Sequence, residues 1–240
     1  MGPGPMTPAV RALVYTNAGV FFLSFIAAMS GNETIVAVLG LKPQLLFERL
    51  FVWTPVTYLF VHDPTGFGHI LFNMLALWMF GVDLERRWGT RAFLRYYFAT
   101  GVGAGIGTAL LSLLPFAPMR AMYNVTTVGA SGAIYGLLLA WAVLFPARQI
   151  LFMFIFPLPA RIAALLMAGM AFLSAASGRN GSVAEATHLS GFVIGWFYLK
   201  GPRQLQLDLQ YRLTKWRMAR MRKRFNVHAG GRDRDGNWIH

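Results

Sequence analysis

The stretch TVGASGAIYGLLLAWAVLF, residues 127–145, contains no charged side chain and sets the character of the whole chain. As an α-helix it would span about 28 Å, close to the roughly 30 Å of a bilayer's hydrocarbon core. Further apolar blocks of similar length recur along the 240 residues, at 10–30, 67–82, 92–114, 159–175 and 183–199. We therefore expect an all-α polytopic membrane protein with six transmembrane helices.

The composition agrees with a membrane protein rather than a soluble one. Hydrophobic residues make up 56% of the chain and charged residues only 13%, with a mean hydropathy of +0.49. A soluble domain carries about 25% charged residues. The apolar run at 149–157 is bounded by Pro157 and Pro159, so we interpret it as an interfacial lead-in to the fifth helix.

Residues 10–30 also fit a second interpretation, a cleaved signal peptide, because Ala28 and Ser30 resemble small-residue cleavage positions. The length of the block and the single preceding arginine favour a retained span. The chain contains no cysteine, which excludes disulfides, thiolate metal sites and a cysteine nucleophile.

The net charge of +13 is concentrated at one end of the chain. Eleven of the 22 Lys and Arg residues lie at or beyond Lys200, so we expect a membrane domain over 1–200 and a basic tail over 201–240. A tail of this kind does not indicate a nucleic-acid partner. Two interpretations stay open for it: a solvated stop-transfer segment, or a basic amphipathic helix on anionic lipid. The second rests on apolar residues at helical spacing, namely Leu205, Leu209, Leu213 and Trp216.

The loop charges predict the orientation. Eighteen of the 22 Lys and Arg residues fall at the N-terminal end of the first span, in or next to the second and fourth loops, and in the tail, whereas the other loops hold four. By the positive-inside rule both termini are cytoplasmic and the large first loop faces outward. The second, fourth and sixth helices then begin at the outer face. His69, Asn73, Ser131 and His188 all lie near those outer ends, and polar groups at such depth are functional-site candidates.

Ser131 lies in G-A-S-G, where Gly129 and Gly132 leave space for a substrate or a neighbouring helix. We expect Thr126 or Thr127 to cap the helix, which leaves the Ser131 amide in the first turn without an intrahelical acceptor. An amide at the positive end of a helix suits a tetrahedral oxyanion. The same small residues are also typical of close helix packing, and this alternative stays open.

The segment after His188 contains Gly191 and Gly195, which form a G-x-x-x-G pattern typical of closely packed helices. A second such pattern follows Ser131, so we expect the fourth and sixth helices to touch. Contact at their outer ends would bring the His188 imidazole to the Ser131 hydroxyl, where it would serve as a base.

A catalytic triad would also need a carboxylate. Between Arg86 and Lys200 the only acid is Glu185, which we expect in the fifth loop. We therefore predict a Ser–His dyad, with the Tyr135 ring orienting His188 by stacking.

His69 and Asn73 are four residues apart and share one helical face, which fits either a joint role or a pair of interhelical hydrogen bonds. His62, His69 and His188 all face outward, but the chain has no H-E-x-x-H motif. We therefore predict no metal site.

The motifs H-I-L-F-N-M at 69–74, G-A-S-G-x-x-Y at 129–135 and H-x-x-G-x-x-x-G at 188–195, in this order, closely resemble the rhomboid family of intramembrane serine proteases. The resemblance covers roughly residues 45–200 and extends to V-D-L-E-R-R-W-G at 82–89.

This resemblance implies a six-helix rhomboid bundle with a water-filled cavity open to the outside. It implies Ser131 as nucleophile, His188 as general base and acid, and an oxyanion hole of His69, Asn73 and the Ser131 amide, with Tyr135 packed on His188. Substrates would be transmembrane proteins cut near the outer end of a span, with no cofactor. Separately from the resemblance, a short chain with an outward site and no organelle signal suggests a bacterial inner membrane. The main alternative is a catalytically silent rhomboid-like protein that binds transmembrane segments. A transporter or channel is disfavoured, since neither midplane ionisable residues nor a repeat is present.

Overall fold

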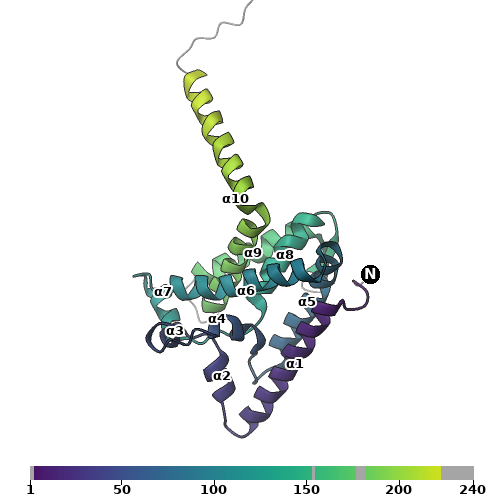
Figure 1. The fold of residues 1–240 in the computed structure, drawn as a ribbon, viewed down its shortest axis with the longest axis vertical. Coiled ribbons are helices and arrows are strands. Elements are labelled where there is room, and N and C mark those ends of the chain that lie inside the picture. Colours follow the sequence, from purple (N-terminus) through teal and green to yellow (C-terminus); the bar gives the residue numbers. More distant parts are fainter. Residues whose placement is uncertain (1–2, 153–154, 177–181, 223–240) are drawn as a thin grey trace, which may run out of the picture. The chain divides into compact units, whose positions relative to one another are not determined.

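The computed structural model describes residues 3–152, 155–176 and 182–222. Each of the six predicted apolar segments contains a helix (Figure 1). These long helices are α1 (Pro8–Met29), α5 (Phe67–Trp88), α6 (Thr90–Leu111), α8 (Ser131–Leu144), α9 (Ala160–Ala176) and α10 (Ser182–Arg222). Among the described helices, α1 and α5 are both long and apolar enough to cross a membrane, while α8 and α9 are shorter apolar helices. The count of six spans therefore stays a prediction.

Short helices occupy the predicted outward loops. The first loop contains α2 (Thr34–Leu39), α3 (Pro43–Glu48), α4 (Thr54–Thr57) and the 3-10 helix η1 (Tyr58–Phe60), and the third contains α7 (Ala117–Ala121) and η2 (Met122–Asn124). An isolated antiparallel bridge joins the two loops, because Leu41 and Thr127 exchange backbone hydrogen bonds of 2.9 and 2.7 Å. The expectation that Thr126 or Thr127 caps the fourth helix was wrong. Thr127 pairs with Leu41, and α8 begins at Ser131 with Ala130 as its N-cap.

A small β-hairpin departs from the predicted all-α architecture. β1 (Gln149–Phe152) pairs antiparallel with β2 (Phe156–Pro159), and the amide of Ala160 donates to the carbonyl of Arg148 at 2.8 Å. The segment is rich in Ile and Phe, which favour extended backbone on a half-buried surface. Proline is tolerated in β2 because both strands of a two-stranded hairpin are edges. The interfacial lead-in predicted for 149–157 is thus a strand pair in its described part.

Helix α8 lies at the centre of the core and packs against α5, α6 and α9. Leu137, Ala140 and Trp141 on α8 are buried. The first loop reaches the same core through Tyr58, whose hydroxyl donates to the carbonyl of Gly101 on α6 at 2.6 Å. A Cβ atom on Gly101 would lie 2.7 Å from Leu59, so this loop packs directly on the helix backbone.

The carboxylate of Glu85 connects the C-terminal end of α5 to the N-terminal end of α1. Glu85 is only 3% exposed and accepts hydrogen bonds from the amides of Ala9 and Val10, at 3.0 and 3.1 Å. The hydroxyls of Thr7 and Thr90 also donate to it. An acceptor from α5 thereby satisfies the first-turn amides of α1, which have no partners within their own helix.

By its internal contacts the chain divides into Met1–Leu199 and Lys200–His240. Gly201, with a φ of 65°, interrupts the helical backbone of α10 close to this division. The basic tail predicted for 201–240 lies only partly within the described residues, because 223–240 fall outside them. A separate role for the tail stays a prediction.

Candidate active site

The His188 and Ser131 side chains meet in the structure. His188 Nε2 lies 2.8 Å from Ser131 Oγ, a hydrogen-bonding distance. Ser131 is the first residue of α8 and His188 lies in the second turn of α10, so two segments distant in sequence supply the pair. The distance is short enough for a proton to pass between the two atoms.

Glycines allow α8 and α10 to approach this closely. A Cβ atom on Gly191 would lie 2.1 Å from the carbonyl oxygen of Gly132. A Cβ atom on Gly195 would lie 3.4 Å from the α-carbon of Gly136 and 2.6 Å from the hydroxyl oxygen of Tyr96. The two G-x-x-x-G patterns therefore face each other, as expected from the sequence.

The aromatic ring of Tyr135 covers one face of the His188 imidazole. The ring centroids are 4.1 Å apart and the planes are inclined by 5°. Phe192 packs edge-on against Tyr135, with a centroid distance of 5.4 Å. Tyr135 follows Ser131 by one helical turn, so a single face of α8 presents both residues to His188.

The other ring nitrogen of His188, Nδ1, contacts the carboxylate of Glu185. Nδ1 lies 3.1 Å from Glu185 Oε2, with side-chain exposures of 15% for His188 and 25% for Glu185. Glu185 was expected in the fifth loop, and this contact was not predicted. In the structure Glu185 lies in the first turn of α10. The spacing E-x-x-H was the available signal, since residues three apart on a helix are neighbours.

The Ser131 amide, as the first of α8, has no intrahelical acceptor and lies at the positive end of the helix. Gly129 precedes it with a φ of +114°, which favours glycine, and a Cβ atom there would lie 2.8 Å from Nε2 of His69. The His69 ring therefore lies against the backbone just before Ser131. Asn73 follows one turn later on α5 and donates from Nδ2 to the carbonyl of His69 at 2.8 Å. The amide nitrogen of Asn73 carries a second N–H for another acceptor.

His62 lies behind His69 in the first loop. Its ring centroid is 5.0 Å from that of His69 and the residue is fully buried. Burial, together with repulsion from His69, lowers the pKa of His62 to about 3, although an interaction with the backbone of Phe60 opposes this shift. His62 is therefore neutral at physiological pH. Over the residues that the structure describes, no three His, Asp or Glu side chains are grouped so as to hold a metal ion.

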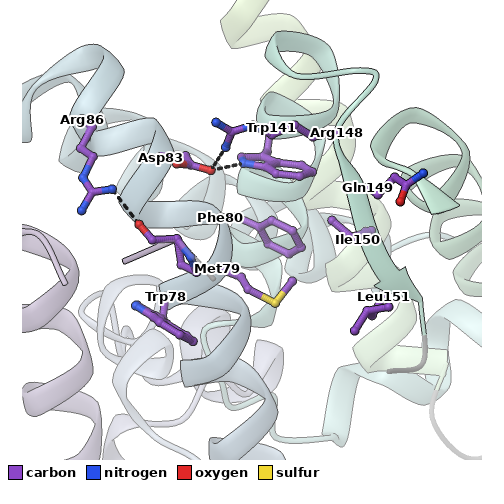
Figure 2. Close-up of a pocket in the computed structure, with 11 residues that line it drawn as sticks. Trp78, Met79, Phe80, Asp83, Arg86, Trp141, Arg148, Gln149, Ile150 and Leu151 are labelled. Atoms are coloured by element: carbon purple, nitrogen blue, oxygen red, sulfur yellow. Dashed lines mark hydrogen bonds and ion pairs between the residues drawn. The ribbon is translucent and has the colours of Figure 1, made fainter. Parts of the chain in front are cut away.

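A cavity of about 750 Å³ lies away from these residues, between α5, α8 and the hairpin (Figure 2). At its edge Asp83 accepts a hydrogen bond from Trp141 Nε1 at 3.0 Å and pairs with Arg148. Figure 2 shows Met79 and Phe80 of α5 facing Ile150 and Leu151 of β1. None of the polar candidates from the sequence lines this cavity, so we assign the chemistry to the Ser131 region instead, on the basis of side-chain geometry.

Comparisons with known proteins place the chain in a family. A Rhomboid domain model matches residues 50–201. Rhomboid protease GluP of Bacillus subtilis is 30% identical over 178 residues, which cover 74% of this chain and 31% of that protein. Rhomboid protein 1, mitochondrial, of Saccharomyces cerevisiae is 32% identical over 162 residues, covering 66% of this chain and 45% of that one.

Rhomboid protease GlpG of Yersinia pestis is 28% identical over 199 residues, covering 80% of this chain and 60% of that protein. The chain thus spans between 31% and 60% of the length of these three relatives. The domain match extends over more than half of the chain, and the relatives share the family name. This protein belongs to the rhomboid family of polytopic membrane proteins.

Proposed function

We propose that this protein is an intramembrane serine protease that hydrolyses peptide bonds within or near the outer end of transmembrane substrates. The observation that carries this proposal is the 2.8 Å distance between His188 Nε2 and Ser131 Oγ. The names of the relatives GluP and GlpG, both proteases, support it. The proposed setting is a lipid bilayer with both termini cytoplasmic, in a bacterial inner membrane, and no cofactor takes part.

In the first step Ser131 Oγ attacks the scissile carbonyl carbon while its proton passes to His188 Nε2. The carbonyl π bond opens and its electron pair moves to the oxygen, which gives a tetrahedral oxyanion and an imidazolium. A base within hydrogen-bond reach contributes typically about 10²- to 10⁴-fold to such a step.

The oxyanion forms beside the N-terminus of α8. The Ser131 amide, His69 and Asn73 are the donors that we propose for it. The His69 ring lies against the backbone of Gly129, which precedes Ser131 by two residues. Fixed donors of this kind stabilise developing charge, and the loss of one costs about 10²- to 10³-fold in kcat.

The tetrahedral intermediate then collapses, the C–N bond breaks, and His188 donates its proton to the leaving amine. Water completes the reaction: His188 accepts a proton as the hydroxide oxygen bonds to the acyl carbon, and then returns that proton to Ser131 Oγ as the ester bond breaks. Both steps use the same two side chains, so one hydrogen-bonded pair is sufficient for the cycle.

The test is labelling with a fluorophosphonate probe, followed by cleavage of a transmembrane substrate in proteoliposomes. We expect the wild type to be labelled and to cleave, and Ser131→Ala and His188→Ala to lose both properties. Ser24→Ala, which removes a buried hydroxyl on α1, is the matched control and should keep both. Equal labelling of all four proteins, or intact substrate with folded wild type, would favour the silent binding protein.

A further inference from the structure

We infer that Glu185 is a positioning residue, whose carboxylate holds the His188 imidazole in the tautomer that serves Ser131. This inference rests on the proposed function for its catalytic consequence, although the tautomer itself is a property of the resting protein. It adds a third residue, which positions His188, to the predicted Ser–His dyad.

The two hydrogen-bond contacts of His188 lie on opposite ring nitrogens. Nδ1 is 3.1 Å from Glu185 Oε2, and Nε2 is 2.8 Å from Ser131 Oγ. A neutral imidazole has one nitrogen that donates and one that accepts. An ionised carboxylate only accepts, so Nδ1 must carry the hydrogen beside Glu185. Nε2 then keeps its lone pair for the proton of Ser131, as a general base requires.

Stacking on Tyr135 does not make this selection. The two rings are nearly parallel, at 5°, and their centroids are 4.1 Å apart. A 180° rotation about the Cβ–Cγ bond returns the imidazole to the same plane and leaves such a stack intact, but it moves Nδ1 away from Glu185 and Nε2 away from Ser131. Tyr135 therefore fixes the plane of His188, and Glu185 fixes which way round the ring lies in that plane and which nitrogen carries the hydrogen.

The Glu185 carboxylate also stabilises the positive charge that develops on His188 during the reaction. When His188 accepts a proton, Glu185 faces the new positive charge across one hydrogen bond. The exposure of Glu185, 25% of its side chain, leaves part of its field screened by solvent.

The position of Glu185 in the fold supports a stable contact. It lies in the first turn of α10, where the helix end favours a negative charge. It precedes His188 by three residues, so the helix backbone itself holds the two side chains side by side. No movement of a loop is needed to form the pair.

The first experiment reads the tautomer directly. In 15N-labelled protein the His188 ring nitrogens should report hydrogen on Nδ1 in the wild type and a mixture of tautomers in Glu185→Gln. Glu33→Gln, which removes the same charge from an exposed position at the start of α2, should leave the wild-type signature unchanged. An unchanged His188 signature in Glu185→Gln would overturn the inference, whether or not the protein proves to be a protease.

The second experiment reads the catalytic consequence. We expect Glu185→Gln to lower kcat by about 10²-fold with little change in KM, less than the ~10⁴-fold loss for a fully buried triad aspartate, because Glu185 is partly exposed. Glu185→Asp should restore part of the activity, since the carboxylate is retained. Wild-type kcat in Glu185→Gln would also contradict the inference. Inactive wild type would instead refute the proposed function, and the tautomer measurement would still decide the role of Glu185.

Discussion

The carbonyl oxygen of Gly132 occupies the space that a side chain on Gly191 would need, since a Cβ atom there would lie only 2.1 Å away. This contact lets α8 and α10 approach closely beside the reactive residues. Because those helices carry Ser131 and His188, a wider separation at Gly191 is expected to lengthen the 2.8 Å distance between the two reactive groups.

Gly191→Ala should therefore separate the pair and lower both activity and stability. Overpacking of a close contact costs about 1–3 kcal/mol, and a displacement of about 1 Å at a reacting pair can cost about 10²-fold in rate. Gly169→Ala on α9 is the matched control, because a Cβ atom there meets nothing within 4 Å. Probe labelling and thermal unfolding in detergent measure the two effects. Equal labelling of both variants would show that the helix contact does not control the pair.

Two substitutions of Tyr135 separate stacking from the hydroxyl group. Tyr135→Phe keeps the ring over His188 and should retain most of the activity, whereas Tyr135→Ala removes the stack. An aromatic pair contributes about 0.5–1.5 kcal/mol beyond its buried area, so Tyr135→Ala should lose about 10-fold in kcat/KM. Full activity in Tyr135→Ala would show that the ring is dispensable.

Removal of the Glu85 carboxylate should weaken the attachment of α1 to α5. In Glu85→Ala the amides of Ala9 and Val10 lose their acceptor, and an unsatisfied buried donor costs about 1–3 kcal/mol. We expect a lower Tm with the labelling of folded protein unchanged, because this contact lies at the opposite end of α5 from His69. Glu33→Gln provides the control for loss of charge. A Tm equal to that of the wild type would contradict the assigned role.

The buried His62 should make stability depend on pH. Its pKa is about 3 in the folded protein, whereas an exposed imidazole has a pKa of 6.5, so the unfolded chain binds the extra proton. Stability is therefore highest above about pH 6.5 and falls as the pH drops toward 3. Between pH 7 and pH 5 the loss from this group is roughly 2 kcal/mol.

The variant His62→Gln isolates that contribution, because glutamine does not titrate. Thermal unfolding at pH 7 and at pH 5 should show a smaller difference in Tm for His62→Gln than for the wild type. If the difference in Tm between pH 7 and pH 5 were equal in the two proteins, protonation of His62 would not destabilise the folded state.

The proposed orientation is open to direct measurement, since the chain has no native cysteine. Single cysteines at Glu33, in the first loop, and at Arg91, just after α5, replace exposed side chains on predicted opposite sides. In intact cells an impermeant maleimide should label Glu33→Cys alone. Labelling of Arg91→Cys alone would reverse the predicted topology.

The positions of the helices and the polar residues to suspect could be predicted from the sequence. A long apolar segment in a membrane can satisfy its backbone hydrogen bonds within itself by forming a helix, and this requirement is local. The close approach of Gly132 and Gly191 was predictable for a similar reason, because a missing side chain marks a close approach in either helix. The depth of the polar residues and the two glycine patterns directed attention to Ser131 and His188, and the family resemblance then assigned their roles.

Other features depend on the tertiary structure. The described part of the run at 149–157 forms paired strands, whose register depends on the partner strand, whereas the apolar pattern by itself fits either a strand or a helix end. Thr127 pairs with Leu41 from a distant loop instead of capping α8. Glu185 reaches Nδ1 of His188 because α10 begins early enough to include it. Each of these contacts depends on where a second segment lies in space, and the local pattern of side chains does not specify that position.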